Sequence, residues 1–270
     1  MRPAGPVRLT AEETEDAFHL LDPAAVTYEA LTAAERGGDG TPLLRVRPAA
    51  DELLLSGRLL SPGVALPASG VLRLWRACLC AAAARALTVP GVVTAGLVGP
   101  AAADRAYPAL LGRALPDLTH VALYDGGAVR APRGSAARGA GAAQTRAADV
   151  REALFGADLV ILTSHGDTVA YDWLSRGAVL VNATGRRLAR TLYERADRLV
   201  VDDARQRPAR MPAPALACLG DVLSGPLPVR RPAGETVLVD LYGLGTYNRW
   251  FTVELCRAAL ACGLGRPRRD

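Results

Sequence analysis

The sequence contains no lysine, so all 32 of its basic residues are arginine. A chain without lysine cannot form a Schiff base on a side chain, and it has no side-chain ammonium group whose pKa could be tuned for acid–base work. Imidazole is scarce as well, because the histidines are His19, His120 and His165. Any proton transfer must therefore use histidine, a carboxylate, a cofactor or the substrate itself.

Long apolar runs, metal-ligand spacings and dense basic tracts are also missing. No apolar run reaches the roughly 18 residues of a membrane-spanning helix, and the N-terminus lacks the apolar core of a signal peptide. The five cysteines do not have zinc-ligand spacing, and their odd number favours reduced thiols over disulfides. The net charge is +5, but the arginines are dispersed, which gives little support for nucleic-acid binding. We therefore expect a soluble, cytoplasmic protein with no metal site and no membrane or nucleic-acid partner.

The first third of the chain predicts helices and short strands. Thr10 with a glutamate three residues later indicates a capping box at the start of one helix, and Asp22-Pro23 indicates the start of a second. Short strands are expected over 42–48 and 51–60. A long, alanine-rich helix is expected over 71–87.

After Pro90 the pattern changes to apolar strands that alternate with helical segments. The expected strands cover 92–99, 120–125, 158–164, 178–185, 198–203 and 235–245. This alternation predicts an α/β fold with a Rossmann-type, doubly wound parallel sheet covered by helices on both faces. Within the Gly/Ala/Arg-rich stretch 126–147, a loop is expected over 131–142.

The stretch "TAGLVGPAAADRAYPALLG", 94–112, lies where a doubly wound sheet binds pyrophosphate through backbone N–H groups at a helix N-terminus. Gly99 takes the position of the first glycine of such a loop, and Ala101 replaces the second. Asp104 lies where a third small residue is usual, and its carboxylate would cap the helix and repel phosphate. The cofactor-binding residues expected in this loop are Gly99, Ala101, Ala102 and Ala103.

Asp125 ends the second apolar strand of this region. A carboxylate at that position binds the hydroxyl groups of the adenosine ribose and repels a 2′-phosphate, which favours NAD(H) over NADP(H). Asp125 can instead simply begin the Asp-Gly-Gly turn that follows the strand. Both interpretations stay open at this point.

The order of the motifs resembles the ornithine cyclodeaminase/mu-crystallin family. The N-terminal helical pair, the arginine-bearing helix "VLRLWRACLCAAAARAL", and then "GADLVILTS", "WLSRGAVLVNATG", "ADRLVVDD" and "LGDVLSG" follow in the family's order. Two stretches, "GLVGPAAADRAYPALL" and "LYGLGTYNRW", look like the branch that contains the siderophore-associated dehydrogenases that form 2,3-diaminopropionate. The resemblance covers nearly the whole chain.

The resemblance implies two domains and a chemistry. Residues 1–75 with 246–270 would form a smaller α+β domain for substrate binding and dimerisation, and residues 76–245 would form the Rossmann-like dinucleotide-binding domain. It also implies a homodimer, NAD as cofactor, and hydride transfer through an imine at the carbon that bears the nitrogen of a small amino-acid-like substrate.

The resemblance also assigns roles to individual residues. Arg76 matches the family's arginine that binds the substrate carboxylate, although it can equally face solvent; Arg45 and Arg47 lie near a second such arginine, and the sequence does not choose between them. His165 follows the strand 158–164, whose carboxyl end should face the cofactor crevice, and the unperturbed imidazole group is suited to proton transfer near neutral pH. A loop histidine bonded to backbone is the alternative for His165. Further candidate cofactor-binding residues are Thr163 and Ser164, which can bond the pyrophosphate or the nicotinamide edge or simply end the strand. Gly243 and Gly245 can allow a close backbone approach near the active-site mouth or form an ordinary tight turn.

The sequence departs from the family at its catalytic motifs. The N-terminal domain is short and lacks the family's lysine-bearing strands, the loop after "VNATG" lacks the usual aspartate, and the glycine loop is degenerate. Two hypotheses follow. The first is an NAD-dependent oxidoreductase or cyclodeaminase-like enzyme of specialised-metabolite biosynthesis, acting on an amino acid or its imine. The second is a family member without catalysis that serves as a binding or scaffold partner of a biosynthetic enzyme.

Overall fold

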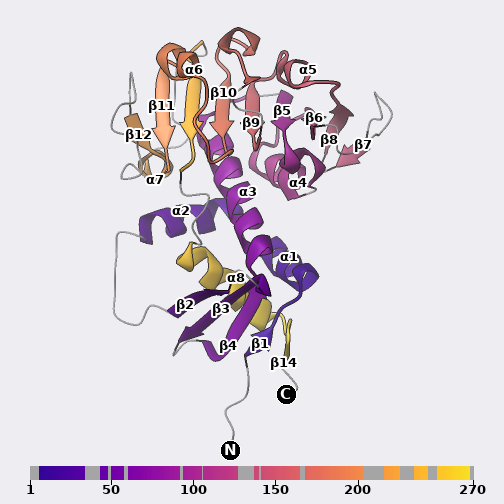
Figure 1. Ribbon diagram of the computed structural model, residues 1–270, viewed down its shortest axis with the longest axis vertical. Helices are drawn as coiled ribbons and strands as arrows, with labels where there is room; N and C mark the ends of the chain where they lie inside the picture. Colours follow the sequence, from indigo (N-terminus) through magenta and orange to yellow (C-terminus); the bar gives the residue numbers. More distant parts are fainter. Residues whose placement is uncertain are drawn as a thin grey trace, which may run out of the picture. The chain divides into compact units, whose positions relative to one another are not determined.

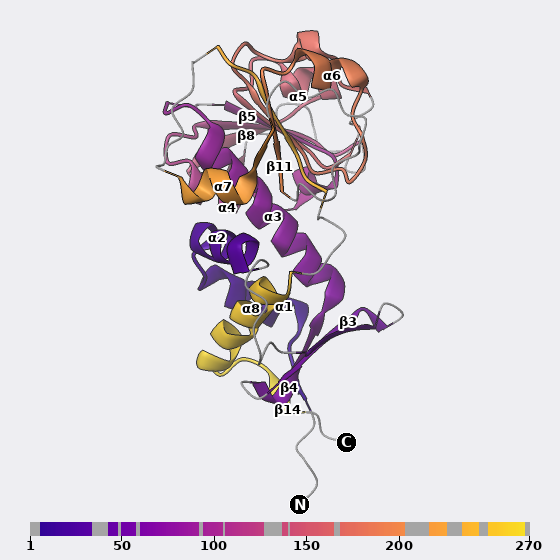
Figure 2. The same ribbon diagram turned by 90° about the vertical axis from the view of Figure 1, so that its left-hand side faces the viewer.

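The structure is a computed structural model of the chain (Figures 1 and 2). It describes residues 6–33, 43–47, 50–57, 60–91, 94–104, 106–126, 137–139, 141–164, 168–202, 216–225, 234–242 and 248–267. Two compact units are present, Met1–Cys78 with Thr246–Asp270, and Leu79–Gly245. The boundary after Cys78 falls inside the helix α3 (Ala68–Leu87).

The first unit contains a five-stranded sheet in the order β14-β1-β4-β3-β2. β3 pairs antiparallel with both β2 and β4, while β1 runs parallel to β4 and antiparallel to β14. The strands are β1 (Val7–Arg8), β2 (Leu43–Arg47), β3 (Glu52–Gly57), β4 (Leu60–Pro67) and β14 (Arg266–Pro267). The chain's two ends therefore meet in neighbouring strands.

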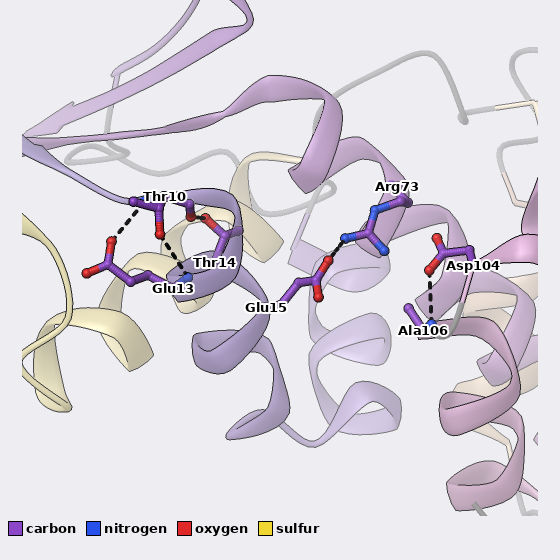
Figure 3. A network of polar contacts seen from close by, with 7 residues as sticks. All are labelled: Thr10, Glu13, Thr14, Glu15, Arg73, Asp104 and Ala106. Carbon is purple, nitrogen blue, oxygen red and sulfur yellow. Dashed lines mark hydrogen bonds and ion pairs between the residues drawn. The ribbon is translucent and has the colours of Figure 1, made fainter. Parts of the chain in front are cut away.

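In its described residues, this unit also contains the helices α1 (Ala11–His19), α2 (Pro23–Ala33) and α8 (Arg249–Ala261), together with the start of α3. The predicted capping box is present at α1, because Thr10 Oγ1 accepts from the Glu13 N–H at 3.1 Å and the Glu13 carboxylate accepts from the Thr10 N–H at 2.8 Å (Figure 3). Phe18, Trp75 and Phe251 are buried, and Phe251 packs against both other rings at centroid distances of 6.2 and 5.3 Å. These aromatic rings join α1, α3 and α8 around one core.

The strand expected over 51–60 is wrong in its extent. β3 ends at Gly57, and the chain returns as a second strand, β4, that the sequence did not indicate. Pro62 and Gly63 hid it, because both residues are depleted in strands. Gly63 is needed where it lies, since a Cβ there would come within 2.9 Å of the Leu55 carbonyl oxygen.

The second unit contains a nine-stranded sheet in the order β12-β11-β13-β10-β9-β5-β6-β8-β7. All its neighbouring strands run parallel except β7, which is antiparallel to β8 at the edge. The strands are β5 (Thr94–Val98), β6 (His120–Tyr124), β7 (Ala137–Gly139), β8 (Ala142–Arg146), β9 (Leu159–Leu162), β10 (Val179–Asn182), β11 (Arg198–Val201), β12 (Leu216–Cys218) and β13 (Val237–Asp240). The run β8-β6-β5-β9-β10 has the 3-2-1-4-5 order of dinucleotide-binding sheets, with its switch point between β5 and β9.

Helices cover both faces of this sheet. α5 (Val150–Leu154) and α6 (Arg190–Arg195) lie on one face, and α4 (Ala106–Ala114), α7 (Leu219–Ser224) and the end of α3 lie on the other (Figure 2). Every residue of β9, β10 and β13 is buried, as expected for strands covered on both faces. The predicted α/β fold with a Rossmann-type, doubly wound sheet is confirmed.

The loop expected over 131–142 is wrong in part, because β7 and the start of β8 fall within it. β8 has the sequence Ala-Ala-Gln-Thr-Arg, with a single β-branched residue and no apolar alternation. Backbone pairing with β6 sets the position of β8, with His120 opposite Ala143 at one end and Leu123 opposite Arg146 at the other. No helix of the described part of the chain is both long and apolar enough to span a membrane.

Candidate functional site

The carboxyl ends of the central strands form one continuous edge. Beyond the strands, the Thr163 N–H donates to the Val98 carbonyl at 2.8 Å, and the Ala183 N–H donates to the Leu162 carbonyl at 2.7 Å. The Leu241 N–H extends the row by donating to Asn182 at 3.1 Å. Open α/β sheets bind ligands outside this edge, at the switch point. The residues that follow β5 and β9 therefore define the candidate site.

Gly99, directly after β5, has a φ of 99° in the left-handed region. Its N–H donates to the Tyr124 carbonyl at 2.7 Å, which ties the ends of β5 and β6 together. A Cβ at this position would lie 2.6 Å from the Ser164 backbone nitrogen and 2.7 Å from Thr163 Oγ1, and closer still to Ser164 Oγ. Gly99 is thus required by the close approach of the β9 end, whatever ligand is bound. The structure brings the predicted Gly99, Thr163 and Ser164 together.

The backbone N–H groups of the loop after Gly99 are largely bonded to other groups of the protein. A short 3-10 helix (Pro100–Ala103) follows Gly99. The Ala101 N–H donates to Thr163 Oγ1 at 3.2 Å, and the Ala102 N–H donates to the Gly99 carbonyl at 2.9 Å. Ala101 and Ala102 are buried, whereas Ala103 is exposed. A phosphate at this turn would have to compete with these internal bonds.

Asp104 caps α4 as the sequence suggested. Its Oδ1 accepts from the Ala106 N–H at 3.0 Å (Figure 3). Its carbonyl accepts from the Tyr107 N–H at 3.3 Å. Pro108, the next residue, has no N–H to offer. The start of α4 thus carries a negative charge at the place where a Rossmann helix receives pyrophosphate.

Asp125 follows β6 and forms an ion pair with an arginine that the sequence did not single out. Arg146, at the end of β8, places Nη1 2.6 Å from Asp125 Oδ2, and the Asp125 side chain is only 6 % exposed. The arginine fixes the carboxylate at the end of the second strand of the fold.

A buried polar network lies at the ends of β10 and β13, and the sequence did not predict it. Asp240 is 1 % exposed, and its carboxylate accepts from Asn182 Nδ2 at 2.7 Å, from the Tyr193 hydroxyl at 2.6 Å and from the Tyr242 hydroxyl at 2.8 Å. Burial raises the pKa of Asp240, although these hydrogen bonds act to lower it. Burial together with Asp240 raises the pKa values of Tyr193 and Tyr242. In the sequence, the only indication of this network is that two otherwise apolar strands each end in a polar residue, Asn182 in β10 and Asp240 in β13.

The remaining predicted residues lie in the first unit or outside the described residues. Arg45 and Arg47 both lie in β2, and Arg45 is exposed. Arg76 is half-buried in α3. His165, Gly243 and Gly245 lie outside the residues that the structure describes. His120, in β6, has Nε2 2.8 Å from Thr145 Oγ1. In the described segments, no group of three His, Cys, Asp or Glu side chains is placed to hold a metal ion.

Comparison with known proteins gives a clear result for the fold. No family model and no curated protein matches the sequence. Among solved structures, CmnK superposes with a TM-score of 0.77 at 20 % identity, over 98 % of each chain. A probable ornithine cyclodeaminase from Bordetella pertussis Tohama I gives 0.69 at 18 % identity, over 97 % of this chain and all of the other. The Δ1-pyrroline-2-carboxylate reductase of Thermococcus litoralis, solved with NADH and L-proline, gives 0.70 at 14 % identity over 97 % and 100 %. The chain therefore has the fold of ornithine cyclodeaminase-like structures along nearly its whole length.

Proposed function

We propose that the chain is a member of the ornithine cyclodeaminase/mu-crystallin family and an NAD-dependent oxidoreductase or cyclodeaminase-like enzyme. It acts on an amino acid or its imine by hydride transfer, in the biosynthesis of a specialised metabolite. The shared fold supports this proposal, as does a structural neighbour solved with NADH and L-proline. This chemistry requires no lysine, because a bound nicotinamide would itself donate or accept the hydride.

The observation that carries the proposal is the pair of Gly99 and Asp125 at the ends of adjacent strands. Gly99 forms the tight turn at the switch point, and the Gly99 N–H bonds to Tyr124, the residue before Asp125. This is the arrangement in which a doubly wound sheet holds a pyrophosphate and an adenosine ribose. The residues present fit the ribose and the tight turn, while the Asp104 carboxylate opposes the pyrophosphate.

The division of roles follows the two parts of the fold. In residues 76–245, the dinucleotide is held by Gly99, Ala101, Ala102, Ala103, Asp125, Thr163, Ser164, Gly243 and Gly245. In residues 1–75 with 246–270, Arg76 and either Arg45 or Arg47 bind the substrate carboxylate through planar guanidinium groups. His165 handles the proton. We propose further that the enzyme works as a homodimer in the cytoplasm.

A second candidate function is favoured by the state of the glycine loop. The Ala101 N–H is bonded to Thr163 Oγ1, and the Ala106 N–H at the start of α4 is bonded to Asp104. A loop whose N–H donors are bonded within the protein can hold the fold without a cofactor. The alternative is therefore a catalytically degenerate protein that binds a biosynthetic enzyme as a scaffold.

Titration of the full chain with NADH, followed by calorimetry, separates the two candidates. If the chain is an enzyme, we expect saturable binding of NADH. The affinity should weaken by about tenfold in Asp125→Ala, because the ribose hydroxyls lose a charged acceptor. Asp172→Ala is the matched control, since it also removes an aspartate from an arginine ion pair, with Arg195. No detectable binding at about 1 mM NADH, a concentration that reveals even weak sites, favours the scaffold.

Asp104→Asn tests the glycine loop directly. Asparagine caps helices as well as aspartate does, so the start of α4 is kept while the negative charge is removed. We expect the Kd for NADH to fall by about two- to fivefold, which corresponds to one charge at a helix N-terminus. An unchanged Kd together with unchanged stability would place the pyrophosphate elsewhere.

Arg76→Ala tests the division of roles. We expect the full chain carrying this change to lose affinity for an amino-acid substrate by about tenfold or more while its Kd for NADH is kept. Calorimetric titration with each ligand measures both quantities. Equal losses of both affinities would contradict separate binding of substrate and cofactor.

A further inference from the structure

Two adjacent arginines lie on the turn between β10 and α6. Arg186 and Arg187 are both exposed, and within the described part of the chain neither forms an ion pair. The arginines that follow differ in this respect, because Arg190 and Arg195 are bound to Glu194 and Asp172 at 2.6 and 2.7 Å. The turn thus presents two positive charges, whereas the arginines of the following helix α6 are paired with carboxylates.

The backbone of this turn is held by side-chain hydrogen bonds. Asn182 donates from Nδ2 to the Arg186 carbonyl at 2.8 Å, and its Oδ1 accepts from the N–H and the hydroxyl of Thr184 at 3.1 and 2.7 Å. The Arg186 N–H donates in turn to Thr184 Oγ1 at 3.0 Å. Gly185, with a φ of 68°, makes the bend. The two arginines therefore project from a preorganised base, which reduces the entropy lost when they bind a ligand.

Both ends of the turn are tied to the same buried carboxylate. Asp240 accepts from Asn182 at the start of the turn and from the Tyr193 hydroxyl. That hydroxyl accepts from the Leu188 N–H at 3.2 Å, at the end of the turn. Burial raises the pKa of Asp240, and the positive charge of Arg187 acts in the opposite direction, so Arg187 lies within electrostatic reach of this carboxylate. Asp240 is thus a positioning residue for the turn.

The turn stands at the ligand-binding edge of the sheet. The Ala183 N–H bonds to Leu162, so the turn begins next to Thr163 and Ser164, and Thr163 bonds to the end of β5. Ligands of open α/β sheets lie outside this edge. Exposed guanidinium groups on a fixed turn at this edge form planar, bidentate contacts with carboxylates and phosphates.

We propose that Arg186 and Arg187 bind an anionic group on the side chain of the substrate, a carboxylate or a phosphate. The substrate class is then an amino acid, or the imine derived from it, with an acidic or phosphorylated side chain. That the bound anion is a substrate rests on the proposed function. Binding of the anion to the two arginines can be measured without a cofactor.

The test is a calorimetric titration of the full chain with two matched pairs of probes, each in the presence and absence of NADH. O-phospho-L-serine is compared with L-serine, and L-glutamate with L-glutamine. We expect the anionic member of at least one pair to bind about tenfold or more tightly than its neutral partner, and this preference to weaken as salt is added. The pair with the larger ratio identifies phosphate or carboxylate as the group.

Variants assign the preference to the turn. The double change Arg186→Gln/Arg187→Gln should bring the ratio close to one, whereas Arg190→Gln, which removes an exposed arginine that is bound to Glu194, should leave it unchanged. Asp240→Asn should reduce the ratio without loss of NADH affinity, and the thermal midpoint of each variant shows that it is folded. An equal effect of the Arg190 control, a ratio that survives the double change, or no binding of either anion at about 10 mM overturns the proposal.

The outcomes keep this inference apart from the proposed function. Absence of NADH binding with an arginine-dependent anion preference contradicts the enzyme and supports the anion site. NADH binding without any anion preference supports the enzyme and contradicts the anion site.

Discussion

Gly99 and Gly91 have similar backbone angles and different surroundings. Their φ values are 99° and 88°. Among the described residues, chain neighbours aside, no heavy atom lies within 4 Å of a Cβ built on Gly91, whereas such a Cβ on Gly99 meets Ser164 and Thr163. Gly91→Ala should cost about 1 kcal/mol of unfolding free energy for the left-handed backbone. Gly99→Ala should cost about 3 kcal/mol or more, because the steric clash adds to that strain. Urea unfolding measures both values, and equal losses would show that the end of β9 yields easily.

Asp240 gives a pH dependence of stability. Burial raises its pKa above the ordinary value of 3.8, so the folded chain binds this proton more tightly than the unfolded chain does. The stability that Asp240 contributes is therefore fully present below the unfolded pKa and is lost as the pH rises through the folded one. Asn at position 240 does not titrate. The unfolding free energy of the wild type minus that of Asp240→Asn should thus decrease from about pH 4 to pH 7, and an increase would contradict the raised pKa.

At the scale of elements, α3 begins with a cap that comes from a distant turn. Asp51, with a φ of 46°, accepts from the Ser69 N–H at 2.7 Å and from the Ser69 hydroxyl at 2.6 Å, which lowers its pKa. Asp51→Ala should lower the urea midpoint more than Asp51→Asn, because asparagine tolerates the left-handed backbone and still accepts from the N–H. The difference between wild type and Asp51→Ala should shrink as the pH falls below 3.8, since the lowered pKa gives stability that is lost on protonation. Equal midpoints for the two variants would show that the cap contributes little.

Local patterns predicted the elements whose cause is local. The Thr10–Glu13 capping box marks α1, and the apolar runs mark β9, β10 and β13, because strands covered on both faces need apolar residues at every position. The sequence did not predict β4 and β8, because the cause of these strands is not local. Backbone pairing with β3 and β6 sets their position, and their own side-chain pattern gives little indication of a strand.

The candidate site divides in the same way. Gly99, Thr163 and Ser164 were predicted because a doubly wound sheet has a fixed binding edge. The Arg146–Asp125 ion pair and the Asn182–Asp240 hydrogen bond join residues from different strands, so no spacing along the chain indicates them. Polar groups at the ends of buried strands are where such tertiary partners should be sought.

At the scale of the whole molecule, the absence of lysine makes a sharp chemical prediction. Treatment with a 2-oxo acid and cyanoborohydride should leave every internal peptide unmodified, because no side-chain amine can form an imine. Mass spectrometry of the digested protein checks this. Arg190→Lys, which places an amine at an exposed position on α6, is the positive control. Reductive labelling of an internal peptide in the unchanged chain would contradict the prediction.

The first unit is assembled from both ends of the chain, since β1 pairs with β14 and α8 packs on α1 and α2. A ribosome that has released residues up to Gly245 has therefore already delivered every strand of the nine-stranded sheet, while Phe18 and Trp75 still lack their partner Phe251. Nascent chains fold from the part that is complete. Premature termination just before α8 would thus yield a protein with a finished central sheet and an exposed aromatic surface, which is the kind of fragment that chaperones and proteases recognise.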